Sequence, residues 1–225
     1  TGPPAPSLDA ERASTPPVSR RTPPVPPVLV RPAGKPRQAG EDLLTDLFEA
    51  AAELSFMADV FDASDFVLGL ALDGIPCKVG LVSFFDINTR EFMVVRQGIV
   101  GGGGTAPEVV LCRRASEFLK PIARTMRHGR SVTFSGEELE ALSEDARWNG
   151  LGFAPRALLS VPVVSSGRYL ALLELADPLD GRPFSDGDGH AITYLAERFA
   201  EFLAQRGLDL DEERVLRPRL AQRRG

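Results

Sequence analysis

Cysteine is scarce in this chain of 225 residues, which holds only Cys77 and Cys112. Two cysteines cannot build the disulfide framework on which small secreted domains depend. They also match no zinc motif, because such sites need paired CxxC segments or cysteines combined with histidines. The sequence therefore predicts a reduced, cytoplasmic setting and no metal site.

Long apolar runs and histidines are also lacking. The longest apolar pieces, such as residues 66–72, are broken by Gly69 and fall short of the roughly 18–20 residues that a membrane-spanning helix needs. His128 and His190 belong to neither a Ser/His/Asp nor an HExxH arrangement, so we expect no catalytic residues and no enzyme. The sequence starts Thr-Gly-Pro-Pro without an initiator Met or signal peptide, and we expect a processed chain or a piece of a longer one.

Proline and charge divide the chain into three parts. Residues 1–40 hold 11 of the 19 prolines and a net charge of +4, which predicts an extended, disordered arm up to about residue 38. This arm is either a spacer or a docking peptide for a protein partner. Residues 41–205 carry 25 Asp and Glu and a net charge of −11, which argues against nucleic acid as a partner. Residues 206–225 form a charged tail.

The first half of the acidic part alternates between helical and strand patterns. Apolar residues at helical spacing predict helices from Glu41 and over 60–72, the second ending at Asp73-Gly-Ile-Pro. The β-branched and aromatic runs 78–86 and 91–97 predict an antiparallel hairpin. Helical spacing then returns over 108–128, with a kink expected at Pro121.

The second half ends in a hairpin and a long helix. A short strand at 131–134 and a helical turn at 136–142 lead to strands 156–164 and 169–176. The last helix is expected over 188–205, capped by Ser185 to Asp188. This order predicts an α+β fold, with an antiparallel sheet that has helices packed on one face and irregular crossovers on the other.

The last 50 residues of this part resemble a known family. Leu158-Leu-Ser-Val-Pro-Val-Val164, then Gly167, Asp177-Pro178 and Pro183-Phe184-Ser185 before a long amphipathic helix are similar to a GAF domain, as are Phe84-Phe85-Asp86 and Asp145-Ala-Arg147-Trp148. The resemblance covers about residues 41–205 and implies a GAF/PAS-like regulatory module, with a pocket between sheet and crossovers in members that bind ligands. The Asn-Lys and Asp-Glu motif typical of cyclic-nucleotide-binding relatives is largely absent. The resemblance names no cofactor.

Four residues in and after the crossovers are candidates for contacting a ligand. An indole can stack on a planar molecule and a guanidinium can hold an anion. The alternative is that the single tryptophan packs in the core. The candidate ligand-binding residues are Arg147, Trp148, Phe153 and Arg156.

The first and last helices carry more apolar side chains than one stripe against a sheet requires. A surplus apolar face in a soluble protein is commonly covered by a second copy, so we predict a homodimer. The alternative is a thick single-chain core. The candidate interface residues are Leu43, Leu47, Leu54, Ile192, Leu195, Phe199 and Phe202.

Three functions remain open at this point. The first is a noncatalytic regulatory module of a signalling protein that senses a small molecule or transmits a signal by dimerising. The second is an interaction scaffold with a filled pocket and a docking arm. The third is a thiol-dependent reductase that uses Cys77 and Cys112, although the larger cysteine set of the reductase branch is missing.

Overall fold

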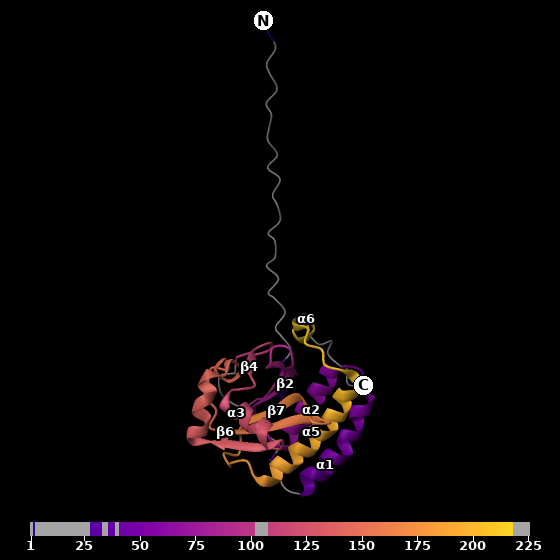
Figure 1. Cartoon of the computed structure of the whole chain (residues 1–225), viewed down its shortest axis with the longest axis vertical. Helices are drawn as coiled ribbons and strands as arrows, with labels where there is room; N and C mark the ends of the chain where they lie inside the picture. Colours follow the sequence, from indigo (N-terminus) through magenta and orange to yellow (C-terminus); the bar gives the residue numbers. More distant parts are fainter. Residues whose placement is uncertain (1, 3–27, 33–35, 39–40, 102–107, 218–225) are drawn as a thin grey trace.

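A seven-stranded sheet forms the centre of the molecule (Figure 1). The computed structural model describes residues 2, 28–32, 36–38, 41–101 and 108–217. The strand order is β1-β3-β2-β7-β6-β5, with the short β4 also paired to β3. The strands are β1 (Leu29–Arg31), β2 (Cys77–Asp86), β3 (Glu91–Val100), β4 (Arg114–Ser116), β5 (Val132–Ser135), β6 (Ala157–Ser165) and β7 (Arg168–Pro178).

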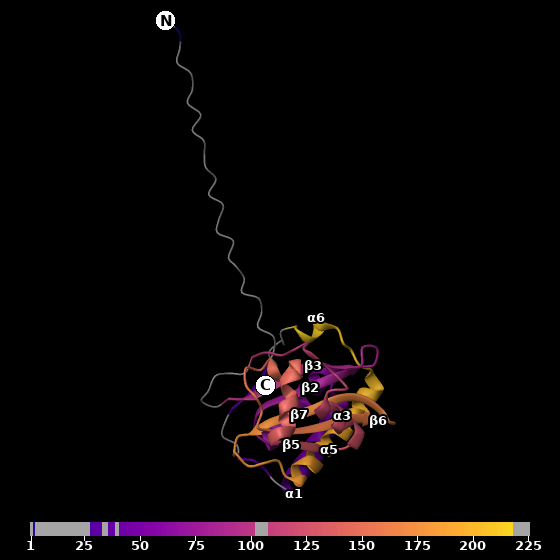
Figure 2. The ribbon, with the colours of Figure 1, turned by 60° about the vertical axis from the view of Figure 1, so that its left-hand side comes forward.

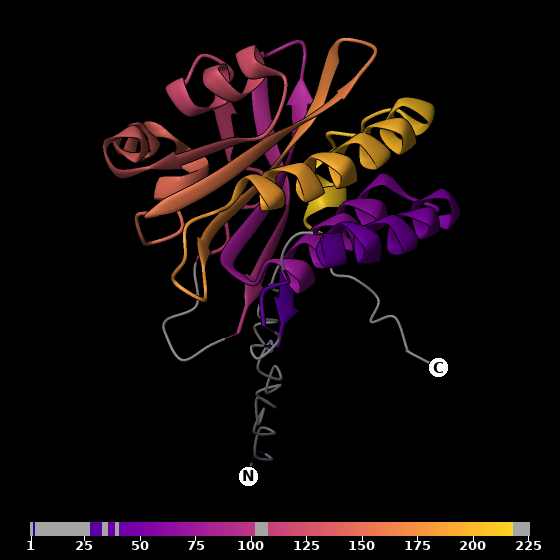
Figure 3. The ribbon, with the colours of Figure 1, turned by 90° about the horizontal axis from the view of Figure 1, so that it is seen from below.

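Helices cover the two faces of the sheet unequally, as Figure 3 shows. The longer helices α1 (Glu41–Ala51), α2 (Val60–Gly74) and α5 (Asp186–Arg206) lie on one face, with the 3₁₀ segment η1 (Ala52–Phe56). The crossovers on the other face hold α3 (Lys120–His128), the 3₁₀ segment η2 (Gly136–Glu144) and the single turn α4 (Ala146–Asn149). The predicted α+β layout is confirmed.

Aromatic packing joins the long helices to the sheet. The ring of Phe84 on β2 lies 6.2 Å from that of Phe61 on α2 and 6.5 Å from that of Phe199 on α5. Such ring pairs add to the free energy gained from burying their area. Gly80 and Gly98 of the central strands leave room for Leu68 and Leu72 of α2, so this helix sits close to the sheet.

The N-terminal arm joins the domain earlier than the proline pattern predicts. β1 pairs in parallel with β3, through Leu29 opposite Gly98, so the sheet is mixed rather than purely antiparallel. Arg37 then donates to Asp188 at the start of α5, to Asp180 (3.3 Å) and to the Pro183 carbonyl (3.1 Å). Edge pairing and these charge-assisted bonds offset the loss of chain entropy. The predicted boundary at residue 41 is therefore wrong, while residues 3–27 lie outside the described part.

The segment 108–128 is not one helix. Gln97 of β3 accepts from the Val110 amide (2.9 Å) and donates to the Glu108 carbonyl (2.9 Å), which holds this stretch as a loop. Cys112 has a left-handed backbone (φ 64°), β4 follows, and α3 begins only beside Pro121. Proline is favoured in the first turn of a helix because it has no amide to leave unpaired. The helical spacing of 108–119 was misleading.

The charged tail also begins as part of the fold. α6 (Glu212–Val215) lies near the β3 end of the sheet (Figure 2), where Glu212 pairs with Arg114 of β4 at 3.6 Å. Val215 is fully buried, and Arg214 pairs with Asp59 (2.5 Å). Residues up to 217 thus belong to the domain, whereas 218–225 lie outside the described residues.

The cap of the last helix is as predicted. Ser185 and Asp188 form a capping box, in which each side chain binds the backbone amide of the other residue. Among the helices that the structure describes, none combines the length and hydropathy needed to cross a bilayer.

We predict that residues 28–32 and 36–38, which we call the strap, stabilise the domain. A chain starting at Glu41 loses the β1 ladder and the Arg37 contacts, and hydrogen bonds to charged groups contribute about 1.5–3 kcal/mol each. Its free energy of unfolding in urea should fall by at least about 1.5 kcal/mol relative to a chain starting at Val28, which keeps the strap. Equal unfolding midpoints for the two chains would contradict this role.

Candidate functional site

A buried arginine lies between the crossovers and the sheet. The Arg147 guanidinium donates to Asp145 (Nη2 to Oδ2, 2.7 Å), to Glu174 (Nη1 to Oε2, 2.9 Å) and to Ser83 (Nη1 to Oγ, 3.1 Å). Arg147, Asp145 and Glu174 are at most 1% exposed. We call Arg147, Asp145, Glu174, Ser83 and Ser160 together the Arg147 network.

Local structure on both sides directs these groups toward each other. Asp145 is the N-cap of α4 and accepts from the Arg147 amide at 2.9 Å, which turns the arginine toward the sheet. Glu174 on β7 is in register with Ser160 on β6, so both point to the crossover face. Ser160 donates to Glu174 at 3.4 Å. One helical turn is thereby fixed to three strands.

Charges in the Arg147 network compensate one another. Burial alone would lower the pKa of Arg147, but the Glu174 and Asp145 carboxylates outweigh this effect and raise the pKa above its ordinary value. Burial raises the pKa of Glu174, and Arg147 offsets this only in part. Arg147 is therefore charged, and its donors are already engaged with protein acceptors.

A pocket of about 300 Å³ lies next to the network, between η2, α4 and the segment leading into β6. Trp148 forms its inner wall and is itself fully buried, while Phe153 is half-buried. Trp148 Nε1 is buried and has no hydrogen-bond partner among the described residues. The other lining residues are Leu139, Glu140, Leu142, Ser143, Asn149, Ala154 and Pro155.

The four candidate ligand-binding residues therefore separate into two pairs. Trp148 and Phe153 line the same pocket, and the Lys78 ammonium lies 3.7 Å from the centre of the Phe153 ring. Arg147 is committed to the network, and Arg156 is exposed and lies outside the pocket lining. Sequence analysis missed Glu174, although a carboxylate within the apolar run of β7 is a signal for a buried partner.

The seven candidate interface residues all lie in the core of the single chain. None is more than 6% exposed: Leu43, Leu47, Leu54, Ile192, Leu195, Phe199 and Phe202. α1 packs against both α2 and α5, so one chain covers more than one stripe of these helices. These side chains are consequently not available to a second copy.

Both cysteines are free and poorly suited to thiol chemistry. Burial raises the pKa of Cys77 well above its ordinary value and raises the pKa of the half-buried Cys112. The thiolate is the reactive form, so a raised pKa lowers reactivity at neutral pH. Within the described ranges, no group of three or more His, Cys, Asp or Glu is placed to hold a metal.

We predict that the Arg147 network contributes strongly to stability. Arg147→Met leaves Asp145 and Glu174 buried without a cation, which should lower the free energy of unfolding by about 3–5 kcal/mol. The matched control is Arg124→Met, which breaks the exposed pair with Glu138 and should cost at most about 1 kcal/mol.

The pH dependence gives a second check on this variant. Glu174 already has a raised pKa, and losing its cation raises it further, so the folded variant binds protons more readily than its unfolded chain. Its stability deficit should therefore shrink as the pH falls from 8 to 5. A loss of stability in Arg147→Met that is small, or that grows as the pH falls, would contradict a stabilising role of the Arg147 network.

The fold is shared by solved structures of low sequence identity. The GAF domain of the Acinetobacter phosphoenolpyruvate-protein phosphotransferase has a TM-score of 0.56 at 13% identity, over 76% of this chain and 99% of that chain. The GAF domain of the corresponding Coxiella burnetii protein has a TM-score of 0.58 at 15% identity, over 72% and 93%. The free methionine-R-sulfoxide reductase of Neisseria meningitidis has a TM-score of 0.56 at 12% identity, over 76% and 95%.

The sequence itself matches a family model. No curated protein matches the chain. The model of the GAF domain matches residues 51–206, which is more than half of the chain and includes the sheet from β2 to β7. The chain therefore belongs to the GAF domain family.

Proposed function

We propose that this chain is a noncatalytic regulatory GAF module of a cytoplasmic signalling protein, which senses a small apolar molecule in the pocket beside Trp148. The observation that carries the proposal is the combination of an apolar pocket and a buried donor, Trp148 Nε1, that has no partner in the described part of the chain. The volume of about 300 Å³ lies at the lower end of the range for ligand pockets, roughly 300–1,000 Å³.

The buried indole N–H of Trp148 makes the pocket prefer a ligand that carries a hydrogen-bond acceptor. A buried donor without an acceptor costs about 1–3 kcal/mol, which a bound acceptor would restore. Leu139, Leu142, Phe153 and Pro155 supply the apolar surface around it. A compact ligand with a hydrocarbon body and one acceptor fits these walls better than an anion does, because the Arg147 donors are engaged elsewhere.

A regulatory role agrees better with the site chemistry than an enzymatic one. The likeness to the Neisseria reductase, at 12% identity, concerns the fold alone. Burial raises the pKa of both Cys77 and Cys112, which disfavours the thiolates that a thiol reductase needs. The two unpaired thiols are what a reduced cytoplasm maintains.

The alternative is an interaction scaffold in which the interior is permanently filled. The Arg147 network supports it, since protein side chains occupy the polar part of the space between crossovers and sheet. Its docking arm would be the proline-rich segment, most of which lies outside the described residues. Ligand binding beside Trp148 separates the sensor from the scaffold.

We predict that isobutylbenzene, a probe for apolar pockets, changes the emission of Trp148 saturably. Trp148 is the one tryptophan of the chain, so intrinsic fluorescence reports directly on this pocket. Ala154→Phe, which fills the pocket from its exposed side, should abolish the change. Ala52→Phe, on the exposed surface of η1, is the matched control and should leave the change intact.

A response that survives Ala154→Phe would place the probe elsewhere and argue against this pocket. Acetophenone, a second aromatic probe, carries one hydrogen-bond acceptor. If neither isobutylbenzene nor acetophenone changes the emission of Trp148, the scaffold is favoured.

An exposed aromatic stripe supports a homodimer built from other residues than those first considered. On α1 and η1, the exposed large apolar side chains are Leu44 (41%), Phe48 (64%) and Phe56 (86%). Phe48 stacks on Tyr194 of the neighbouring α5 with ring centroids 5.9 Å apart, so the stripe continues across two helices. Two copies related by two-fold symmetry would cover it reciprocally.

We predict that Phe48→Glu dissociates this dimer. In sedimentation at tens of micromolar, the native chain should run at twice its 24.3 kDa and the variant at 24.3 kDa. The control Phe118→Glu changes an equally exposed phenylalanine (67%) on the opposite face and should leave the mass unchanged. A native chain of 24.3 kDa would exclude the dimer. Leu47 and Phe199 are unsuitable targets, because their substitution disturbs the core.

A further inference from the structure

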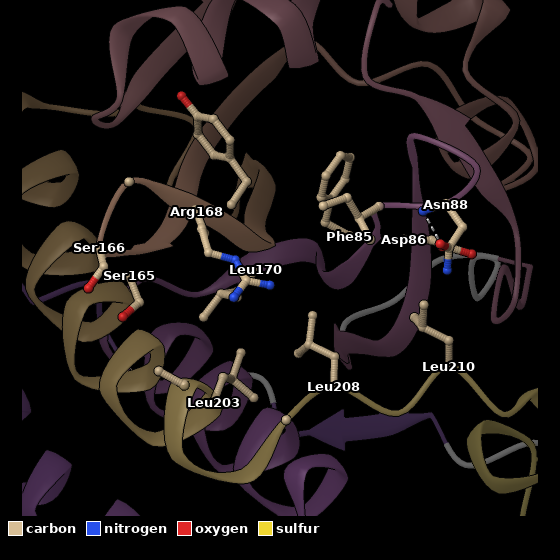
Figure 4. Close-up of a pocket in the computed structure, with 15 residues that line it drawn as sticks. Phe85, Asp86, Asn88, Ser165, Ser166, Arg168, Leu170, Leu203, Leu208 and Leu210 are labelled. Atoms are coloured by element: carbon tan, nitrogen blue, oxygen red, sulfur yellow. Dashed lines mark hydrogen bonds between the residues drawn. The ribbon is translucent and has the colours of Figure 1, made fainter.

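A second pocket lies at the other end of the sheet, where three segments far apart in the sequence meet (Figure 4). The turn after β2, the turn between β6 and β7, and the end of α5 with residues 207–210 enclose about 660 Å³. This volume is well within the range of roughly 300–1,000 Å³ for pockets that bind small molecules. Neither Trp148 nor the Arg147 network contributes to it.

The walls of this pocket are mainly apolar. Leu203 (1% exposed) and Leu170 (9%) form its buried side, and Leu208 and Leu210 are half-buried. Phe85 is held in place by Phe92, with ring centroids 4.8 Å apart. A hydrocarbon body would gain free energy in proportion to the apolar area it buries here.

One cation in the pocket has no protein partner. The hairpin turn places Ser166 (φ 50°) and Gly167 (φ 75°) in the left-handed region, as two-residue hairpin turns require, and Arg168 begins β7 directly after it. Figure 4 shows the Arg168 guanidinium reaching over Leu170 into the pocket. Within the described part of the chain, it forms no hydrogen bond or ion pair.

The acidic group of the pocket is already occupied. Asp86 accepts from the Asn88 amide (3.0 Å) and from Arg114 (3.2 Å). Burial raises the pKa of Asp86, but these hydrogen bonds outweigh burial and lower the pKa overall, so the carboxylate is charged. Asp86 is therefore engaged with Arg114 and leaves Arg168 available to bind an anion.

We propose that this pocket binds a small amphiphilic monocarboxylate, with its carboxylate on Arg168 and its hydrocarbon part against Phe85, Leu170 and Leu203. A guanidinium fork matches a carboxylate in two parallel hydrogen bonds. Arg168 is the one cation among the described residues that line the pocket, so it compensates only one of the two charges of a dianionic phosphate ester. This site is separate from the Trp148 pocket and takes a different chemical class of ligand.

The position of the pocket gives binding a structural consequence. Leu203, Ala204 and Gly207 belong to the last turn and C-cap of α5, and residues 208–210 continue the wall. A bound carboxylate would connect two strand turns to the point where the chain leaves α5. That this connection regulates the protein rests on the proposed function. Carboxylate binding in the pocket does not depend on that function.

The experiment uses octanoate as the probe in isothermal titration calorimetry of the full chain. Octanoate should bind, and octanamide should bind at least about tenfold more weakly, because it lacks the charge-assisted hydrogen bond, which contributes about 1.5 kcal/mol or more. Octyl phosphate should bind more weakly than octanoate, because Arg168 compensates only one of its two charges. Arg168→Gln should weaken octanoate binding at least about tenfold. The matched control, Arg130→Gln, removes an exposed arginine outside the pocket and should leave octanoate binding unchanged.

Three outcomes would overturn the proposal: no octanoate binding, equal binding of octanamide, or an unchanged affinity in Arg168→Gln. Tighter binding of octyl phosphate would also overturn it. Ala154→Phe, which fills the Trp148 pocket, should leave octanoate binding intact, and Arg168→Gln should leave the Trp148 response to isobutylbenzene intact. Failure of this site and failure of the proposed sensor function are thus distinguishable.

Discussion

The charge of Arg147, buried at the centre of the domain, constrains the structure around it. A guanidinium removed from water requires compensating carboxylates and a full set of acceptors, which here come from Asp145 and Glu174 together with Ser83. The acceptors lie at the N-cap of α4, on β7 and on β2, so all hydrogen bonds of the arginine can form only when the crossovers sit in one position on the sheet. Packing of apolar side chains alone would tolerate small shifts, and the buried charge does not.

The residue next to Arg147 experiences the opposite environment. α4 is a single turn, and its Asp145 cap sets the direction in which Arg147 leaves the backbone. Trp148 then projects toward η2 and the pocket, where no described residue supplies an acceptor for its Nε1. A rigid network thus holds an unsatisfied donor beside an apolar pocket. This juxtaposition explains why a ligand that fills the pocket would change the environment of Trp148 without having to displace Arg147.

The sequence patterns predicted local helices and hairpins better than they predicted contacts between residues far apart in the chain. The period of apolar residues located α1, α2, α5 and both hairpins, because these elements bury one face within a contiguous segment. β1 was not predicted, because its three residues lie in a proline-rich stretch and form a strand only by pairing with β3, some 70 residues later. On α1, Leu43 and Leu44 are adjacent, and no pattern tells which one faces the core: Leu43 is buried and Leu44 is 41% exposed. Likewise, the sequence does not show that Arg147 pairs with Glu174, 27 residues later, rather than with an anionic ligand.

α5 links the features at the two ends of the domain. Its first turn is capped by Ser185 and Asp188, and Arg37 of the N-terminal strap pairs with Asp188. Its middle is fixed to the core through Ile192, Leu195 and Phe199, so the helix cannot slide as a unit without breaking this packing. Its last turn, by contrast, borders the Arg168 pocket and ends at the exposed Gly207. An effect of binding at that pocket would therefore be confined to the end of α5 and the chain beyond it, rather than moving the whole helix.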